Sequence, residues 1–186
     1  IGCAVITGAG AVLHAAKVQS GDSVAIIGVG GVGLSAVAAA AHLGADPIIA
    51  VDLDDDKLDF AKKFGATHGV NASQVDPVAA VRDLTEIANQ FDVLRQPIAG
   101  VDYAFDCIGR AVTMRQVSEM IRSGEFGLSK GGTAVLVGVP QTPIELDSRH
   151  MFIGERSYIC SLGGSCSPAE DLPRFIEWHR RGVLDL

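Results

Sequence analysis

The stretch from Ser23 to Asp52 constrains the fold more than any other part of the chain. Its sequence is SVAIIGVGGVGLSAVAAAAHLGADPIIAVD. An apolar run meets a cluster of glycines, a long alanine-rich stretch follows, and a second apolar run ends on Asp52. This order predicts a buried strand, a sharp turn, a helix packed against the strand, and a second strand parallel to the first.

Three of the glycines have separate physical roles in such a unit. Gly28 lets the chain turn out of the first strand, Gly30 leaves room for a pyrophosphate, and Gly33 lets the helix pack closely. The helix N terminus then offers free N–H groups and the positive end of a dipole. Asp52 is placed to accept hydrogen bonds from a ribose diol. The stretch therefore predicts a dinucleotide site that includes Gly28, Val29, Gly30, Gly31, Val32, Gly33 and Asp52.

Strand-like and helical segments alternate along the rest of the chain. This predicts an α/β Rossmann fold, a doubly wound six-stranded parallel sheet with helices on both faces. The four further strands are expected at residues 68–71, 101–106, 133–137 and 157–162. Helices are expected at 54–65, 76–88, 112–121 and 167–179, with an irregular loop at 89–100. A capping box is expected at 167–170, and the helix after it should bury Leu172, Phe175, Ile176 and His179.

Composition limits the function classes. The chain has 186 residues, 48% of them hydrophobic, which suits one domain of ordinary size. A net charge of -7 argues against binding to nucleic acid or to an anionic membrane surface. No apolar stretch reaches the roughly 20 residues that a membrane span needs. Because the chain does not begin with methionine, we expect it to be part of a longer protein.

Cysteines and histidines give no independent metal signal. The cysteines Cys3, Cys107, Cys160 and Cys166 are scattered, which favours a reducing, cytoplasmic setting over a disulfide scaffold. The last three are expected to be small packing residues. The histidines show no metal-binding spacing and are expected at structural or surface positions.

The acidic residues after the second strand favour NAD over NADP. Asp52 would repel a 2′-phosphate, and Asp54, Asp55 and Asp56 add negative charge. No arginine or lysine directly follows Asp52. The nearest lysine, Lys57, could bond a ribose hydroxyl or could equally be a solvated helix residue.

The chain resembles the coenzyme-binding domain of zinc-dependent medium-chain alcohol dehydrogenases. The matching pieces span nearly the whole chain in the order of that family. They are Gly2-Cys3, Thr7-Gly8, Gly28-Val29-Gly30-Gly31-Val32-Gly33, Val51-Asp52, Phe105-Asp106-Cys107-Ile108-Gly109, Val137-Gly138-Val139-Pro140 and Leu162-Gly163-Gly164.

The resemblance implies roles for individual residues. Cys3 would be a ligand of the catalytic zinc and Thr7 would pack beside the nicotinamide ring. Asp52 and Lys57 would contact the adenosine ribose. The segment with Cys107, Ile108 and Arg110 would run past the adenosine side. Backbone contacts to the nicotinamide carboxamide would come from Val137, Gly138, Val139, Cys160 and Leu162.

The resemblance also implies an activity that needs more than this chain. In such enzymes zinc acts as a Lewis acid on an alcohol, and hydride passes to NAD+ to give an aldehyde or ketone. The other zinc ligands belong to a catalytic domain, so residues 1–20 would connect to it and residues 21–186 would form the NAD-binding domain. The isolated chain is expected to be inactive. A homodimer or tetramer would form through the edge strand near Ser157–Leu162.

Four other protein classes share parts of this sequence pattern. A zinc-independent quinone or enoyl reductase shares the glycine loop, but usually prefers NADPH and lacks a cysteine matching Cys3. A non-catalytic NAD-sensing module needs only cofactor binding. A methyltransferase is disfavoured by Gly33, and a short-chain dehydrogenase by Val12 and His14 where its motif needs glycines. The substrate stays open among simple alcohols, aromatic alcohols and thiol–formaldehyde adducts.

Overall fold

Six parallel strands form one sheet in the computed structural model of the protein, which describes residues 2–184. The strand order is β3-β2-β1-β4-β5-β6, and every neighbouring pair is parallel. The predicted Rossmann fold is therefore confirmed. The strands are β1 (Val24–Ile27), β2 (Ile48–Asp52), β3 (His68–Asn71), β4 (Tyr103–Asp106), β5 (Thr133–Leu136) and β6 (Ser157–Cys160).

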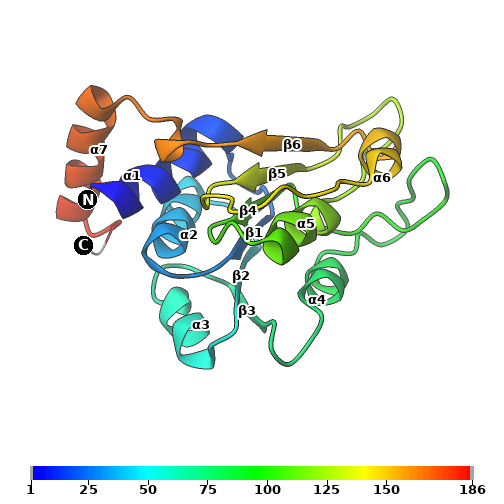
Figure 1. Cartoon of the computed structure of the whole chain (residues 1–186), viewed down its shortest axis with the longest axis horizontal. Coiled ribbons are helices and arrows are strands. Elements are labelled where there is room, and N and C mark those ends of the chain that lie inside the picture. The colour runs from blue at the N-terminus through cyan, green and yellow to red at the C-terminus, as the bar shows by residue number, and fades with distance from the viewer. Residues whose placement is uncertain (1, 185–186) are drawn as a thin grey trace.

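Helices cover both faces of this sheet (Figure 1). Two helical segments precede β1, and α2 follows the glycine loop. The helices are α1 (Cys3–Gly10), the π-helix η1 (Ala11–Ala16), α2 (Gly31–Leu43), α3 (Asp55–Lys62), α4 (Pro77–Leu84), α5 (Ala111–Met120), α6 (Ser148–Ile153), the 3-10 helix η2 (Gly163–Ser165) and α7 (Pro168–Arg180).

The central strand β1 is buried on both sides, because the sheet lies between two layers of helix. Val24 and Ile26 join the cluster that contains residues of α2 and α7. Ala25 and Ile27 join the opposite cluster, which includes Val81 of α4 and Val117 of α5. A parallel strand in this position reads as a continuous apolar run rather than an alternating one. That is why the run Val24–Ile27 predicted a buried strand.

Helix α4 begins as predicted but ends early. Asp76 caps it by accepting a hydrogen bond from the Val78 N–H at 3.0 Å. The helix ends at Leu84, so Ala88 lies outside it. Thr85 follows, and its hydroxyl donates to the Val81 carbonyl at 2.7 Å and accepts from the Gly100 N–H at 2.9 Å. These bonds tie the end of α4 to the end of the expected loop at 89–100, which the structure confirms as turns with one short bridge.

The prediction for α7 is wrong in two respects. Its buried residues are Asp171, Phe175 and Trp178, whereas Ile176 and His179 are exposed. The capping box does not form, because the Ser167 side chain makes no capping bond. Instead the Ser167 N–H donates to Asp171 Oδ2 at 2.9 Å. A buried carboxylate therefore caps this helix, and apolar periodicity alone did not identify it.

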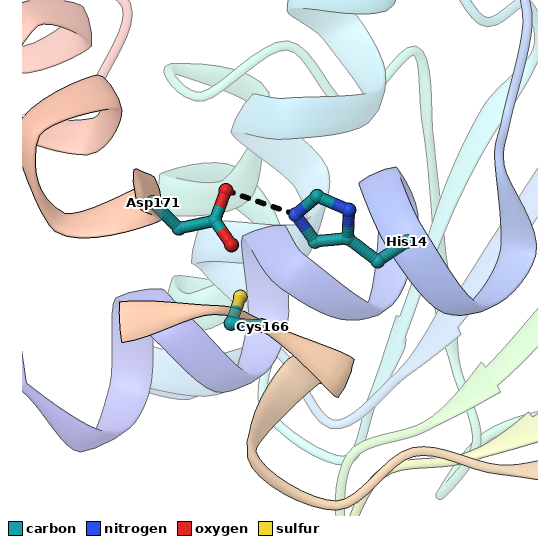
Figure 2. A group of neighbouring side chains, drawn as sticks. All are labelled: His14, Cys166 and Asp171. Carbon is teal, nitrogen blue, oxygen red and sulfur yellow. Dashed lines mark hydrogen bonds and ion pairs between the residues drawn. The ribbon is translucent and has the colours of Figure 1, made fainter. Parts of the chain in front are cut away.

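Asp171 joins the two ends of the described chain (Figure 2). Its side chain is 2% exposed, and Oδ1 pairs with His14 Nε2 at 2.9 Å and with Arg174 Nη1 at 2.8 Å. Beside it, the Cys166 thiol donates to the Ile6 carbonyl at 3.4 Å. Burial works to raise the pKa of Asp171, but the hydrogen bonds from His14 and Ser167 outweigh it and lower the pKa. Burial, and then the Asp171 carboxylate, raise the pKa of the Cys166 thiol to about 11.

Replacing Asp171 should destabilise the fold. We expect Asp171→Asn to lower the free energy of unfolding by about 3 kcal/mol, because it leaves the partners of a buried ion pair unmatched. Urea unfolding measures the change. Glu170→Gln, on the exposed neighbour, should stay within about 0.5 kcal/mol of the wild type. Equal stability of the two variants would contradict the role given to Asp171.

The contribution of Asp171 should also depend on pH. Its folded pKa lies below its unfolded value, so the stabilisation is full above the unfolded pKa of about 3.9. It is lost as the pH falls through the folded pKa. The stability difference between wild type and Asp171→Asn should therefore shrink on going from about pH 7 to about pH 3. A constant difference over this range would show that the charge of Asp171 is not involved.

Candidate functional site: a cleft at the carboxyl ends of the strands

A cleft of about 610 Å³ opens at the carboxyl ends of β1, β2 and β4. The chain leaves β1 in one direction toward β2 and later returns to β4 on its other side, so this is where the strand order reverses. Ligands of doubly wound sheets bind at such a point. The cleft is lined by Ile27, Gly28, Gly30, Gly31, Val32, Gly33, Val51, Asp52, Leu53, Lys57, Ala72, Cys107, Ile108, Arg110, Val112, Thr113 and Gln116.

The glycine loop has the geometry that its sequence predicts. Gly28 has a φ of 87°, a backbone conformation that favours glycine. A Cβ on Gly33 would overlap with the carbonyl oxygen of Gly28, so α2 could not lie this close to β1 with any other residue. A Cβ on Gly30, in contrast, would meet nothing within 4 Å. The space that a pyrophosphate needs beside Gly30 is therefore present.

The N terminus of α2 faces this space without a side-chain cap. Gly30 is the N-cap residue, and it has no side chain that could bond the first N–H groups of the helix. The thirteen-residue helix adds the positive end of its dipole at the same point. Uncapped N–H groups at a helix N terminus bind anionic groups, phosphate above all.

Asp52 ends β2 and fixes the loop as well as facing the cleft. Oδ2 accepts from the Val29 N–H at 3.0 Å, and Oδ1 accepts from the Leu53 N–H at 2.8 Å. Lys57 Nζ lies 3.8 Å from Oδ1. Each carboxylate oxygen accepts more than one hydrogen bond, so both keep capacity for a diol. The bond to Val29 was not predicted, since it depends on how the turn folds back over the strand end.

Asp106 organises the other wall of the cleft. It is fully buried at the end of β4 and accepts from the N–H groups of Ile108 and Gly109 at 2.8 and 3.0 Å. The Thr113 hydroxyl donates to its other oxygen at 3.0 Å. The turn that carries Cys107, Ile108 and Arg110 is thereby held against the glycine loop. The sequence motif contained Asp106, but its positioning role was missed.

Burial is the main influence on the pKa values of two side chains in this wall, Asp106 and Cys107. It raises the pKa of Asp106 even though three hydrogen bonds to the carboxylate work in the opposite direction. Burial, followed by the Asp106 charge, also raises the pKa of the Cys107 thiol far above its usual value. A thiol held in its neutral form is a poor nucleophile and a poor metal ligand. Cys107 therefore contributes shape to the cleft, as a packing residue should.

The remaining predicted contacts lie along the same sheet edge, outside the cleft itself. Val137 and Gly138 follow β5, and the Gly138 backbone lies against that of Ile108 and Gly109. Val139 and Leu162 are 77% and 93% exposed. Cys160 ends β6 and is also exposed, so its expected packing role is not seen in this structure. These residues could border a ligand that extends beyond the cleft toward β6.

The first helix brings Cys3 and Thr7 close to the N terminus of α2. Ala4 lies next to Gly31, and Gly8 packs against the Val32 carbonyl. Cys3 itself is exposed at the first turn of α1. Among residues 2–184, the one group of three potential metal ligands is His14, Cys166 and Asp171, which does not include Cys3. The described residues therefore do not complete a zinc site around Cys3.

Several cleft residues were not predicted. Leu53 and Val112 expose apolar side chains beside Asp52 and Ile108, and Ala72, Thr113 and Gln116 complete this part of the lining. Apolar side chains on either side of the predicted ribose position suit the flat faces of a purine. Their positions in the sequence could have identified them. Leu53 and Ala72 each directly follow a strand, and the other three lie in the first turns of α5.

Residues 2–184 contain no helix with the length and apolar character to cross a membrane.

Comparison with known proteins shows which family the chain belongs to. The sequence model of a family described as zinc-binding dehydrogenase matches residues 31–181. The chain belongs to this family. As a member of it, the chain corresponds to the NAD-binding domain, and its relatives are named alcohol dehydrogenases. The predicted resemblance is thereby confirmed.

Individual relatives agree with this assignment. The chain is 33% identical, over its whole length, to S-(hydroxymethyl)glutathione dehydrogenase of Paracoccus denitrificans. The structure of benzyl alcohol dehydrogenase from Acinetobacter calcoaceticus matches 97% of the chain at 32% identity with a TM-score of 0.82. A protein described as a zinc-binding dehydrogenase from Sinorhizobium meliloti, solved with NADP, matches 99% at 26% identity with a TM-score of 0.76.

The chain spans just under half the length of these proteins. The match covers 47% of the Paracoccus protein, 45% of the Acinetobacter structure and 48% of the Sinorhizobium structure.

Removing the Asp106 carboxylate should loosen the second wall of the cleft. We expect Asp106→Ala to lower the free energy of unfolding by about 3 kcal/mol, since three buried donors lose their acceptor. Asp106→Asn should cost less, because its amide oxygen still accepts from Ile108 and Gly109 while the Thr113 hydroxyl accepts from the amide nitrogen. Thermal and urea unfolding of both variants measure the order. An Asn variant as unstable as the Ala variant would contradict this geometry.

Proposed function

We propose that this chain binds NAD(H) in the cleft between the glycine loop and the Cys107–Arg110 turn. The pyrophosphate would lie beside Gly30 at the N terminus of α2, and the adenosine ribose would bond Asp52. The observation that carries this proposal is the coincidence of open space at Gly30 with an uncapped helix N terminus. Anions bind such a position because N–H groups and the helix dipole act together.

The adenosine end would extend from Asp52 between exposed apolar side chains. Ile108 and Val112 come from one wall and Leu53 from the other. Lys57 is close enough to Asp52 to bond a ribose hydroxyl at the same time. The nicotinamide would lie toward Val137, Val139 and Leu162, with Thr7 of α1 on its other side. These placements follow the resemblance and the common sheet edge on which the residues lie.

The charge around Asp52 favours NAD over NADP. A 2′-phosphate would approach a carboxylate whose oxygens already face the cleft, with Asp54, Asp55 and Asp56 immediately beyond it. Lys57 is the cation that pairs with Asp52, and that carboxylate already balances its charge. Like charges at such distances disfavour binding, so the dinucleotide without the extra phosphate should bind more tightly.

In the whole protein we propose oxidation of an alcohol to an aldehyde or ketone. The alcohol would lose a hydride to C4 of NAD+ and its hydroxyl proton to a base. Zinc supplies Lewis-acid polarisation of the alcohol oxygen in such enzymes. Cys3 would be the ligand contributed by this domain, and its exposure at the start of α1 leaves it accessible. The names of the relatives support alcohols or thiol–formaldehyde adducts as the substrate class.

The edge strand β6 supports assembly into a homodimer or tetramer. It pairs with β5 on one side, and its other side has no strand partner within residues 2–184. Unpaired edge strands need a cover or a partner. We propose that a second copy pairs with the edge near Ser157–Leu162.

Adding one methyl group at Gly30 should weaken cofactor binding without destabilising the fold. The Gly30 backbone has φ -77° and ψ -164°, which alanine adopts without strain, and its Cβ would enter open space. We expect Gly30→Ala to weaken NADH binding by tenfold or more, about 1.4 kcal/mol, while unfolding stability stays equal or rises slightly. Fluorescence titration with NADH and urea unfolding measure the two effects.

Gly31→Ala is the matched control. Gly31 also lines the cleft, but the atom nearest to its added Cβ would be the Ala4 methyl group, at the ordinary contact distance of 3.4 Å, so the added group is directed toward α1. We expect its NADH affinity to stay within about twofold of the wild type, or about 0.4 kcal/mol. Equal losses in both glycine variants would contradict the placement of the pyrophosphate at Gly30.

The preference between the two cofactors should depend on the Asp52 charge. We expect the wild type to bind NADH more tightly than NADPH, and Asp52→Asn to narrow the gap by roughly tenfold. The Asn side chain keeps one acceptor for the Val29 N–H, and the exposed Leu53 N–H can bond water instead, so the loop should stay in place. Asp56→Asn removes a nearby charge that does not line the cleft and should change the ratio much less. A wild type that prefers NADPH would favour the zinc-independent reductase alternative.

A further inference from the structure

A second cleft, of about 490 Å³, lies on the face of the sheet that carries α4 and α5. Its walls come from α4, from the loop at residues 92–96, from α5, and from α6 with the residues that flank it. Figure 1 shows α4, α5 and α6 grouped on one side of the sheet, away from α1 and α7. None of its lining residues also lines the dinucleotide cleft.

Three arginines line this second cleft, and no carboxylate within residues 2–184 forms an ion pair with any of them. Arg156 is partly buried and is fixed by two backbone carbonyls, since Nε donates to Ile121 at 3.1 Å and Nη1 donates to His150 at 2.7 Å. Its second terminal nitrogen makes no hydrogen bond with the described residues. The side chains of Arg82, from α4, and of Arg149 make no hydrogen bond with the described residues.

Three acidic side chains line the cleft as well, but two of them are engaged locally. Asp92 Oδ1 accepts from the N–H groups of Leu94 and Gln96, each at 2.9 Å. Asp147 Oδ1 accepts from the N–H groups of Arg149 and His150. Glu119 is exposed on α5. These bonds hold Asp92 and Asp147 on their own turns, and no carboxylate of the cleft lies within ion-pair distance of its arginines.

The arginines also influence each other and their neighbours. Burial, and then the charge of Arg82, lower the pKa of Arg156 to about 10, although Asp92 acts in the opposite direction. Burial and the charge of Arg156 lower the pKa of His150, and the charge of Arg82 lowers it further. Arg82 and Arg156 therefore lie close enough to repel each other, and a bound anion would reduce that repulsion.

We propose that Arg82, Arg149 and Arg156 form a binding site for a phosphate-type oxyanion, separate from the dinucleotide cleft. The guanidinium fork donates two parallel hydrogen bonds to oxygens with the spacing of a phosphate group. Arg156 is held in place before binding, which reduces the loss of side-chain entropy. The cleft is larger than a phosphate ion, so the natural ligand is expected to be a small molecule carrying a phosphate group.

Inorganic phosphate is the probe for this site. The chain is first saturated with NADH to fill the dinucleotide cleft, and phosphate is then titrated at constant ionic strength while backbone amide resonances are followed by NMR. We expect saturable shifts centred on Arg82, Arg149 and Arg156. Shifts confined to residues 28–33, or none that saturate, would overturn the proposal.

Variants that remove a positive or a negative charge from the cleft test the proposal further. Arg82→Gln should weaken phosphate binding by roughly tenfold, since it removes charge-assisted hydrogen bonds to the anion without breaking a side-chain hydrogen bond or ion pair among the described residues. Asp92→Asn keeps its acceptor for Leu94 and Gln96 but removes a competing charge, so it should strengthen binding. Arg115→Gln, on the exposed side of α5, is the matched control and should leave the affinity unchanged. If Arg82→Gln binds phosphate as tightly as the wild type, the assignment is wrong.

Discussion

The close contact between Gly33 of α2 and the Gly28 carbonyl is the constraint on which this structure depends. No Cβ fits between them, so the helix axis lies nearer to β1 than side chains would otherwise permit. As a consequence, α2 begins next to the carboxyl end of the central strand. Asp52 then bonds the Val29 N–H and fixes the loop between strand and helix. The dinucleotide cleft is what remains open around this contact.

Two buried carboxylates hold other parts of the fold in place. Asp106 gathers two backbone N–H groups and a hydroxyl, and so holds the turn that forms the second wall of the cleft. Asp171 accepts hydrogen bonds from His14, Arg174 and the Ser167 N–H, and so joins η1 to α7. In both places a charge compensated by several donors fixes a loop whose backbone groups would otherwise lack partners. The Cys107–Arg110 turn lines the cleft itself, whereas α1 lies against the first turn of α2.

Local patterns predicted most of the fold and the glycine side of the site. Apolar runs located β1, β2 and β5, alternation located β4, and strands were also predicted at the positions of β3 and β6. The Asp76–Pro77 pair located the start of α4. The errors came from tertiary contacts. Ala88 was assigned to α4, but the Thr85 hydroxyl ends that helix by bonding Gly100, which is far along the loop. The buried face of α7 was misassigned because Asp171 occupies a position that apolar periodicity treats as surface. Asp106 was visible in its motif, yet its three bonds exist only once the turn has folded.

The structure of the chain with NAD+ bound would test the central claim most directly. The account predicts that the pyrophosphate lies against the N–H groups at the start of α2, next to Gly30, and that the adenosine ribose hydroxyls bond Asp52. It also predicts the adenine between Leu53 on one wall and Ile108 and Val112 on the other. A dinucleotide bound elsewhere, or one whose pyrophosphate makes no contact with the first turn of α2, would contradict it.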